Sequence, residues 1–494
     1  MLHLIFWSAL CLTSPMVAGR CKNIPVDVTW PFDTDWPSLN ASIGGHLLRT
    51  VPAAASCWPN GHFEPSISCN TVQSHSCLPP NVTGYVHDLG CTTRGLPTYI
   101  VNATTETQIA TASKWAADRS IRIVIKCTGH DLNGRSSGAF ALSIWTHNFR
   151  QLRRDISWKH PTKNITEDVY IVGSGQHVGL GGYIQGSGHG PLSRTYGLAA
   201  SHVLQMSVVT TQGEILIAND AQHQDLFWAL RGGGPGLYSL VTEYVLRHHP
   251  APSNVTMTDL LIAPEADRNN ISAEASWKAA VSYLQALPVL MDAGLAGACM
   301  MSTAETAVRF GFLFEATTAF VRPVLAHNGH ESTPNSGSSA VTITFSTSNV
   351  ANYTSCISAI SGSNAAGGQS VVSIRLLGRR ELLGTSRTDM TSYLKTALQA
   401  QNATAPEVQQ TPPGDWGALL PAWRTAYLHF NANGATLWAP ELGAYMNEAI
   451  PFDSEFKRDF YGANYDRLVQ VKANYDPSES LLVLADSGRL CRVD

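Results

Sequence analysis

The sequence predicts an α+β protein built from at least two domains. The chain has 494 residues, more than the roughly 100–200 residues of a typical single domain. Short, β-branched apolar runs of strand length alternate with helical patterns from residue 97 to residue 250. Beyond residue 250 the chain becomes rich in Ala and Ser, and this change in composition indicates a second module.

The composition indicates a folded protein with a nearly neutral surface. Hydrophobic residues make up 44% of the chain and charged residues only 14%, a combination that excludes a mostly disordered chain. The net charge is −4, from 33 basic and 37 acidic residues, and there is no basic block. We therefore expect no nucleic-acid partner, because such binding depends on clustered Lys and Arg. The only long apolar run lies at the N-terminus, so we expect no membrane partner either.

The N-terminus predicts secretion. Residues 2–17 are apolar and lead into Ala18, Gly19 and Arg20, which is typical of a signal peptide, residues 1–19, cleaved after Gly19. A buried N-terminal helix is the alternative, which the sequons and cysteines make less favourable. Eight Asn-X-Ser/Thr sequons predict surface glycosylation. They stand at Asn40, Asn81, Asn102, Asn164, Asn254, Asn270, Asn352 and Asn402.

Cysteine usage also fits an oxidising compartment. Five cysteines crowd the start of the mature chain, and none has the close paired spacing of a zinc site. They are Cys21, Cys57, Cys69, Cys77 and Cys91. One or two disulfides are expected there, and with nine cysteines after the signal peptide at least one thiol is free or pairs elsewhere.

The expected elements fall into four regions after the signal peptide. Residues 20–95 are rich in Pro, Cys, Trp and Ser and should form an irregular cap. In region 96–250, strands are expected at 97–102, 121–126, 141–145, 169–172, 208–217 (a hairpin) and 239–247, and helices at 106–118 and 225–231. In region 251–440, a helix is expected at 276–287 and strands at 309–314, 340–346 and 371–377. Region 441–494 returns to an aromatic and Gly-rich composition, with a helix at 465–473.

Three Gly-containing segments are the candidates for chemistry. In the first, residues 125–138, a turn of Gly and small polar residues follows an apolar strand and contains His130. Backbone N–H groups in such a turn can hold a pyrophosphate, because Gly permits close approach and a positive φ. A His that only hydrogen-bonds its own loop is the alternative for His130.

The second segment, residues 173–197, is unusually dense in Gly, which suits a backbone lying against a flat or extended ligand. A Rossmann fingerprint is rejected here, because its third position would be Val178 and no acidic residue follows at the required distance. In the third segment, residues 225–242, a short helix ends in a Gly run before an apolar strand. Taken alone, it could be a simple helix–strand connection.

Together and in this order, the three segments resemble the flavoproteins of vanillyl-alcohol oxidase (VAO) type, and more narrowly the secreted fungal berberine-bridge-enzyme-like oxidases. The resemblance covers about residues 97–250 and resumes at residues 445–448 and 460–477. It implies a PCMH-type FAD-binding module of two subdomains, completed by the C-terminal segment, and an α+β substrate domain with an antiparallel sheet. It also implies a small organic substrate, hydride transfer to FAD and reoxidation by O2.

The resemblance assigns roles to individual residues. His130 would be bonded covalently to the 8α-methyl of FAD. The neighbouring Lys126, Cys127, Thr128, Gly129 and Asp131 would line the pyrophosphate, and Gly179, Gly182, Gly186, Gly188 and Asn447 would also contact the cofactor. Many relatives have a second, cysteinyl link, but Gly175 stands at that position and we expect a single bond. Tyr445 is the first candidate for a substrate-side acid or base, if burial or a cationic neighbour lowers its pKa, and His189 and Glu448 are the others.

The chain departs from the family pattern at one place. A helix and a strand that normally separate the Gly-Ser-Gly turn from the Val-Gly-x-Gly-Gly turn are missing between Gly175 and Val178. We therefore weigh three functions: a secreted FAD-dependent oxidase of a secondary-metabolite intermediate, an FAD-binding glycoprotein with impaired catalysis, and a cofactor-free carbohydrate-binding or structural glycoprotein. We expect a monomer without a metal site whose partners are the substrate and O2.

Overall fold

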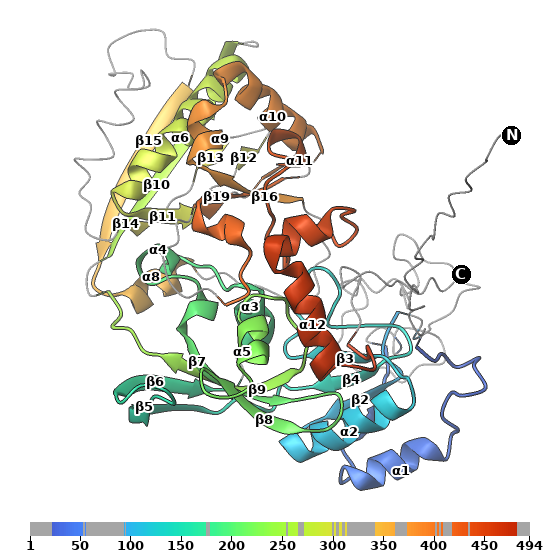
Figure 1. Ribbon diagram of the computed structural model, residues 1–494. Coiled ribbons are helices and arrows are strands. Elements are labelled where there is room, and N and C mark those ends of the chain that lie inside the picture. The colour runs from blue at the N-terminus through green and yellow to red at the C-terminus, as the bar shows by residue number, and fades with distance from the viewer. Residues whose placement is uncertain are drawn as a thin grey trace, which may run out of the picture.

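We describe a computed structural model of the chain (Figure 1). The described residues are 22–52, 55, 93, 95–173, 178–252, 255–264, 271–298, 301–302, 306–308, 312–313, 341–360, 373–400, 403–404, 407–408, 417–432 and 435–481. The predicted signal peptide, the five clustered cysteines, Gly175 and four of the sequons lie outside them. Within the described ranges, no helix has the length and apolar character needed to cross a membrane.

The first sheet is mainly parallel and contains the strand that precedes the His130 turn. Its order is β1-β2-β4-β3, with β1 antiparallel to β2 and the other pairs parallel. The strands are β1 (Leu47–Arg49), β2 (Tyr99–Asn102), β3 (Ile123–Lys126) and β4 (Leu142–Trp145). Helices α1 (Asp35–Ser42) and α2 (Glu106–Asp118) pack against each other and share one buried core with the sheet. Residues 35–49, expected to be irregular, thus contribute a helix and an edge strand.

Helix α2 begins where the sequence predicted it. The Thr105 hydroxyl accepts a hydrogen bond from the Gln108 N–H, and the Gln108 side chain accepts one from the Thr105 N–H. This capping box satisfies two N–H groups that the first turn leaves without helical partners. Thr105 is therefore the N-cap of α2.

The second sheet is antiparallel, with the order β5-β6-β9-β7-β8. Its strands are β5 (Leu152–Lys159), β6 (Thr166–Val172), β7 (Val203–Val209), β8 (Ile215–Asn219) and β9 (Leu240–Arg247). Between β6 and β7 lie α3 (Leu180–Gly186), α4 (Ser193–Tyr196) and the 3-10 turn η3 (Ala199–His202), and α5 (Gln224–Leu230) follows β8. The predicted hairpin is confirmed: β7 and β8 pair antiparallel across a turn with Gly213 at φ +83°.

The third sheet belongs to residues 251–440 and lies at the opposite end of the molecule in Figure 1. It has the order β13-β10-β14-β11-β18-β19-β16, with β15 also paired to β10. Its strands are β10 (Val255–Pro264), β11 (Leu295–Ala298), β13 (Thr306–Val308), β14 (Phe312–Leu313), β15 (Val341–Val350), β16 (Ile374–Gly378), β18 (Glu407–Val408) and β19 (Ala426–Asn431), while β12 (Met301–Ser302) pairs with β17 (Ala403–Thr404). All described pairings within it are antiparallel, as expected for the substrate domain.

Helices cover this third sheet and form a separate core with it. The long helix α6 (Ile271–Asp292) contacts β10, β11, β15 and β19. Helices α9 (Arg379–Gly384) and α10 (Arg387–Ala400) pack on α6. The remaining helices are α8 (Tyr353–Ile360), α11 (Ala435–Trp438) and η4 (Pro421–Arg424).

The C-terminal segment returns to the first two sheets, as expected. It contains η5 (Lys457–Tyr461), η6 (Gly462–Asn464) and α12 (Tyr465–Tyr475), and α12 contacts α5. The buried Lys472 Nζ donates to the carbonyl oxygens of Leu237 (2.9 Å) and Leu481 (2.8 Å) and lies 3.2 Å from Asp476 Oδ2. These bonds attach the segment to the region between α5 and β9.

Candidate active site

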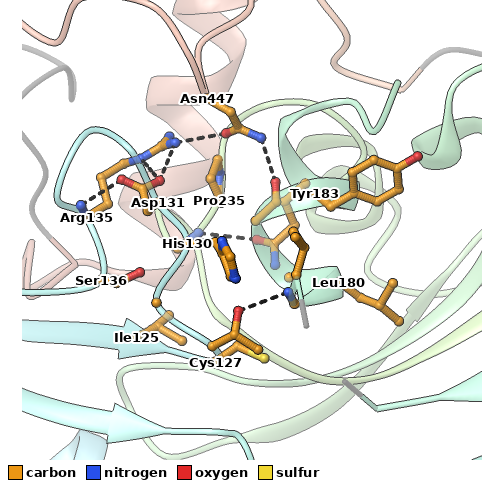
Figure 2. A pocket seen from close by; sticks show the side chains of 18 of the residues that line it. Ile125, Cys127, His130, Asp131, Arg135, Ser136, Leu180, Tyr183, Pro235 and Asn447 are labelled. Atoms are coloured by element: carbon orange, nitrogen blue, oxygen red, sulfur yellow. Dashed lines mark hydrogen bonds and ion pairs between the residues drawn. The ribbon is translucent and has the colours of Figure 1, made fainter. Parts of the chain in front are cut away.

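A cavity of about 830 Å³ lies where the first two sheets meet the C-terminal segment. Figure 2 shows it from close by. Its walls come from β3 and the following turn, from α3 with the residue before it, from Pro235 and Gly236, and from residues 445–448. The volume is in the upper part of the roughly 300–1,000 Å³ range of small-molecule and cofactor sites.

The His130 turn is held in place by one carboxylate. Asp131 Oδ1 accepts hydrogen bonds from the backbone N–H groups of Asn133 (3.0 Å) and Arg135 (2.8 Å). The Arg135 guanidinium also pairs with Asp131, at 2.6 Å between Nη2 and Oδ2. Gly129 adopts φ +91°, a conformation that favours Gly over other residues. The turn therefore presents His130 to the cavity on a fixed backbone, as Figure 2 shows.

Helix α3 forms the facing wall of the cavity. The Gly179 N–H donates to Thr128 Oγ1 (3.0 Å), which joins the start of this wall to the His130 turn. At Gly182 nothing lies within 4 Å of where a Cβ would stand, so its backbone faces open space in the cavity. At Gly186 a Cβ would stand 2.2 Å from Asn447 Nδ2, so this Gly permits the close packing of Asn447.

Asn447 connects three walls of the cavity. Its Oδ1 accepts a hydrogen bond from Arg135 Nη2 (2.8 Å), and its Nδ2 donates to the Gly182 carbonyl oxygen (2.9 Å) and to Tyr445 Oη (2.6 Å). Asn133 Nδ2 adds a bond to the Met446 carbonyl oxygen (2.9 Å). The bond between Arg135 and Asn447 can be followed in Figure 2.

An aromatic and ionisable cluster adjoins the cavity beyond Asn447. His189, Tyr445 and Glu448 line the cavity, and His429 and Trp423 pack behind them. The His189 ring lies edge-on to the Tyr445 ring at 4.8 Å between centroids. Glu448 lies between two imidazoles, with Oε1 3.6 Å from His189 Nε2 and Oε2 3.8 Å from His429 Nε2.

The condition for Tyr445 to act as a base, a lowered pKa, is not met. The phenol is fully buried, and burial, followed by the charge of nearby Glu448, raises its pKa well above the usual value. Desolvation penalises the phenolate, and the nearest acidic neighbour penalises it further. Tyr445 is therefore a neutral phenol in this structure, suited to donating a hydrogen bond.

The structure brings most of the predicted site residues to one cavity. Those that line it are Cys127, Thr128, Gly129, His130, Asp131, Gly179, Gly182, His189, Tyr445, Asn447 and Glu448. Lys126 is exposed at the end of β3 and is not part of the lining. Gly186 and Gly188 lie behind the wall: Gly188, at φ +76°, packs against Ala199 and Tyr183.

Arg135 and His429 are among the residues of the site that were not predicted from the sequence. Arg135 was within the quoted first segment, and its spacing of four from Asp131 was the available signal. His429 lies within the apolar strand β19 and has no signal in the sequence. Among the sequons, Asn164 and Asn352 are exposed, whereas Asn40 and Asn102 are half-buried and accept hydrogen bonds from Leu47 N–H and Asn148.

Comparison with known proteins identifies the class. The family described as "Berberine and berberine like" matches residues 444–481, and "FAD binding domain" matches residues 162–219. The FAD-linked oxidoreductase patO of Aspergillus clavatus is 30% identical over 570 aligned positions, which cover 98% of this chain and 97% of the relative. Because 570 positions exceed the 494 residues of this chain, parts of patO stand opposite gaps in it.

Solved structures agree with this assignment. The VAO-type flavoprotein MtVAO615 from Myceliophthora thermophila C1 matches with a TM-score of 0.80 at 26% identity, over 93% of this chain and 96% of that chain. Glucooligosaccharide oxidase from Acremonium strictum, with a 6-S-cysteinyl, 8α-N1-histidyl FAD, shares the fold at a TM-score of 0.58 and 16% identity, over 78% of this chain and 90% of that chain. The chain belongs to the berberine-bridge-enzyme-like, VAO-type flavoproteins, has their PCMH-type fold and is an FAD-linked oxidoreductase.

Proposed function

We propose that the chain is a secreted oxidase that holds FAD covalently through His130 and oxidises a hydroxyl-bearing secondary-metabolite intermediate, with O2 as the electron acceptor. The observation that carries this proposal is the position of the His130 side chain, which lines the cavity between the Asp131-ordered turn and the open backbone of Gly182. The glucooligosaccharide oxidase described above also has a histidyl bond to FAD, which supports the histidyl link.

The residues present fit the cofactor. The turn that contains Thr128, Gly129 and Asp131 lines the cavity, and its backbone N–H groups can bind a pyrophosphate. The Gly182 backbone leaves room for a flat ring system. When bound, FAD supplies the hydride acceptor and the reactivity with O2. The chain contributes position, exclusion of water by the buried wall at Tyr445, and proton handling.

The substrate end of the cavity is the cluster of His189, Tyr445 and Glu448. As a neutral phenol, Tyr445 is suited to donate a hydrogen bond to the substrate oxygen. The remaining candidates for accepting the substrate proton are Glu448 and His189, which lie 3.6 Å apart and both line the cavity.

The covalent link can be tested by acid precipitation of the purified protein. We expect the flavin absorbance to stay with the precipitated wild-type protein and to enter the supernatant for His130→Ala. His46→Ala is the matched control, because His46 bonds the Asn102 carbonyl oxygen outside the cavity lining and should retain the flavin. Flavin released by the wild-type protein on precipitation would contradict the covalent bond to His130. A flavin-containing protein that releases no peroxide with any alcohol tested would contradict the oxidase activity.

The alternative function is an FAD-binding glycoprotein with impaired catalysis. The short connection between β6 and α3 supports it, because the family resemblance implies a helix and a strand where this chain has only residues 173–179. Photoreduction of the flavin followed by mixing with O2 separates the two functions: rapid reoxidation is expected of the oxidase and slow reoxidation of the alternative. N-terminal sequencing of protein from the culture medium tests secretion, with Arg20 as the expected first residue.

A further inference from the structure

Three ionisable side chains from distant parts of the chain converge beside the cavity. His189 follows α3, His429 is in β19, and Glu448 is in the C-terminal segment. One possible ligand atom from each residue lies within 4.8 Å of those of the other two. His429 is almost fully buried, while the Glu448 side chain is 25% exposed. The group therefore has one closed side in the protein and one side toward the cavity.

The distances within this group are longer than those of direct hydrogen bonds. The two His–Glu separations are 3.6 and 3.8 Å, whereas charge-assisted N–H···O bonds are about 2.7–2.9 Å long. Ligand atoms that surround a Zn²⁺ ion tetrahedrally at about 2.0–2.2 Å lie about 3.4 Å from one another. The two His–Glu separations are close to this value, although they end on different oxygens of Glu448. One ligand atom from each residue lies within 4.8 Å of the others, so side-chain rotation would bring the three onto one ion.

Aromatic rings keep the two histidines of this group in place. The His189 ring stacks on Trp423 at 5.9 Å between centroids and meets Tyr445 edge-on. Trp423 also contacts the His429 ring. These ring contacts hold the two imidazoles beside Glu448, whose side chain is 25% exposed.

We propose that His189, His429 and Glu448 bind one divalent transition-metal ion of the Zn²⁺ class. Two imidazoles and one carboxylate with an open fourth position form the ligand set of catalytic zinc sites. The open position faces the cavity, because His189 and Glu448 line it. This proposal departs from the expectation, drawn from the sequence, of a chain without a metal site.

The role of the ion rests on the proposed oxidase function, whereas its binding does not. At the open position the ion would hold and polarise a hydroxyl or carbonyl oxygen of the substrate. His189 would then act as a ligand only. Glu448 would bind the ion through one carboxylate oxygen and keep the other to accept the hydroxyl proton of the substrate. The substrates favoured by this arrangement are hydroxy compounds with an oxygen that can bind a metal.

Metal content of the full-length protein tests the proposal. Protein stripped with a chelator and then dialysed against Zn²⁺ should retain about one equivalent, the stoichiometry of a single site. Co²⁺ in place of Zn²⁺ should give the visible absorption bands of a low-coordinate site. His189→Gln, His429→Gln and Glu448→Gln should each weaken binding at least tenfold, as removal of a ligand does.

The control is His202→Gln, which changes a histidine that bonds His249 away from the cavity and should bind Zn²⁺ as the wild type does. Circular dichroism of every variant separates a lost site from a lost fold, and the nearly isosteric Glu448→Gln is the variant least able to disturb packing. Equal binding by the wild type and all three ligand variants would overturn the proposal, as would a folded, flavin-containing protein that binds no Zn²⁺ or Co²⁺. Metal binding without any flavin would instead contradict the proposed oxidase and leave the metal site standing.

Discussion

Arg135 and Asn447 are 312 residues apart in the chain and are joined by a hydrogen bond of 2.8 Å between Nη2 and Oδ1. Arg135 also holds Asp131, which orders the turn that presents His130. Asn447 bonds Tyr445 and the Gly182 carbonyl oxygen. The cofactor side and the substrate side of the cavity thus share one polar network, and closure of the C-terminal segment positions both.

The network predicts that Asn447→Ala lowers covalent flavin incorporation. The substitution removes the hydrogen bond that Asn447 accepts from the charged Arg135 side chain. Hydrogen bonds to charged groups contribute about 1.5–3 kcal/mol, so we expect the rate of flavin attachment to fall about tenfold or more. The measurement is the time course of acid-stable flavin after adding FAD to protein produced without it. Arg135→Gln should act in the same way, and the double variant should be little worse than either single one, because the two residues share the bond.

The control for this network is Arg154→Gln. Arg154 forms an exposed ion pair with Asp168 on the β5–β6 hairpin, outside the cavity lining, and its loss should leave incorporation unchanged. If Asn447→Ala incorporated flavin as fast as the wild-type protein, the C-terminal segment would not position the His130 turn.

Gly186→Ala should disturb the same site by sterics alone. The new Cβ would stand 2.2 Å from Asn447 Nδ2, so Asn447 must move away from Tyr445 and Gly182. We expect a loss of about 1–3 kcal/mol in unfolding free energy, typical of overpacking, together with reduced flavin incorporation. Urea denaturation and acid-stable absorbance measure the two effects.

Gly384→Ala is the matched control for Gly186→Ala. Gly384 is the exposed last residue of α9, and a Cβ there meets nothing within 4 Å. Its substitution should change the unfolding free energy by less than about 1 kcal/mol. Equal effects at both glycines would contradict the steric explanation.

Much of the fold follows from local patterns in the sequence. Helix 106–118 was predicted to the residue because the stretch is Ala-rich and follows a threonine suited to the N-cap. The structure adds a capping box of Thr105 and Gln108 at its start. Strands β3, β4 and β9 were predicted within two residues because they are short β-branched runs. Strand β1 was missed because its residues, Leu47–Arg49, are half-buried or exposed at a sheet edge and show no periodic pattern.

The site was predicted only where its residues lie within recognisable segments. His130 stands in a Gly-containing turn and Gly182 in a Gly-rich segment, and the composition of both indicates a bound ligand. His429 could not be predicted, because it lies inside an apolar strand and meets His189, 240 residues away, only after the third sheet docks on the FAD module. The direction of the Tyr445 pKa shift was likewise inaccessible, since it depends on tertiary burial.

Lys472→Met should strongly destabilise the protein. Asp476 is fully buried, and its carboxylate would lose the ammonium 3.2 Å away. Breaking a buried pair by removing one partner costs about 3–5 kcal/mol, because the other charge stays buried. Chemical denaturation followed by fluorescence measures the loss of unfolding free energy, which is taken from the first unfolding transition.

The exposed pair of Lys114 and Asp118 offers a matched control. It has the same residue types at the same spacing, with an N–O distance of 2.9 Å, but the side chains are 55% and 48% exposed. Lys114→Met should therefore cost less than about 1 kcal/mol. A similar loss for both variants would contradict burial as the cause.

His202 should make the protein less stable in acid. Burial, followed by the charge of His249, lowers the pKa of His202 to about 4. In the unfolded chain its pKa is about 6.5, so between these values the unfolded state binds a proton that the folded state does not. The unfolding free energy therefore falls as the pH decreases from about 6.5 to about 4, and His202 accounts for about 1 kcal/mol of the loss at pH about 5.5.

His202→Gln tests this origin of the acid sensitivity, because Gln keeps a polar group beside His249 and does not titrate. We expect the difference in unfolding free energy between about pH 7.5 and about pH 5.5 to shrink by about 1 kcal/mol in the variant. The comparison at pH about 7.5, where His202 is neutral in both the folded and the unfolded chain, isolates any cost of altered packing. Parallel pH profiles for wild type and variant would show that other groups determine the sensitivity.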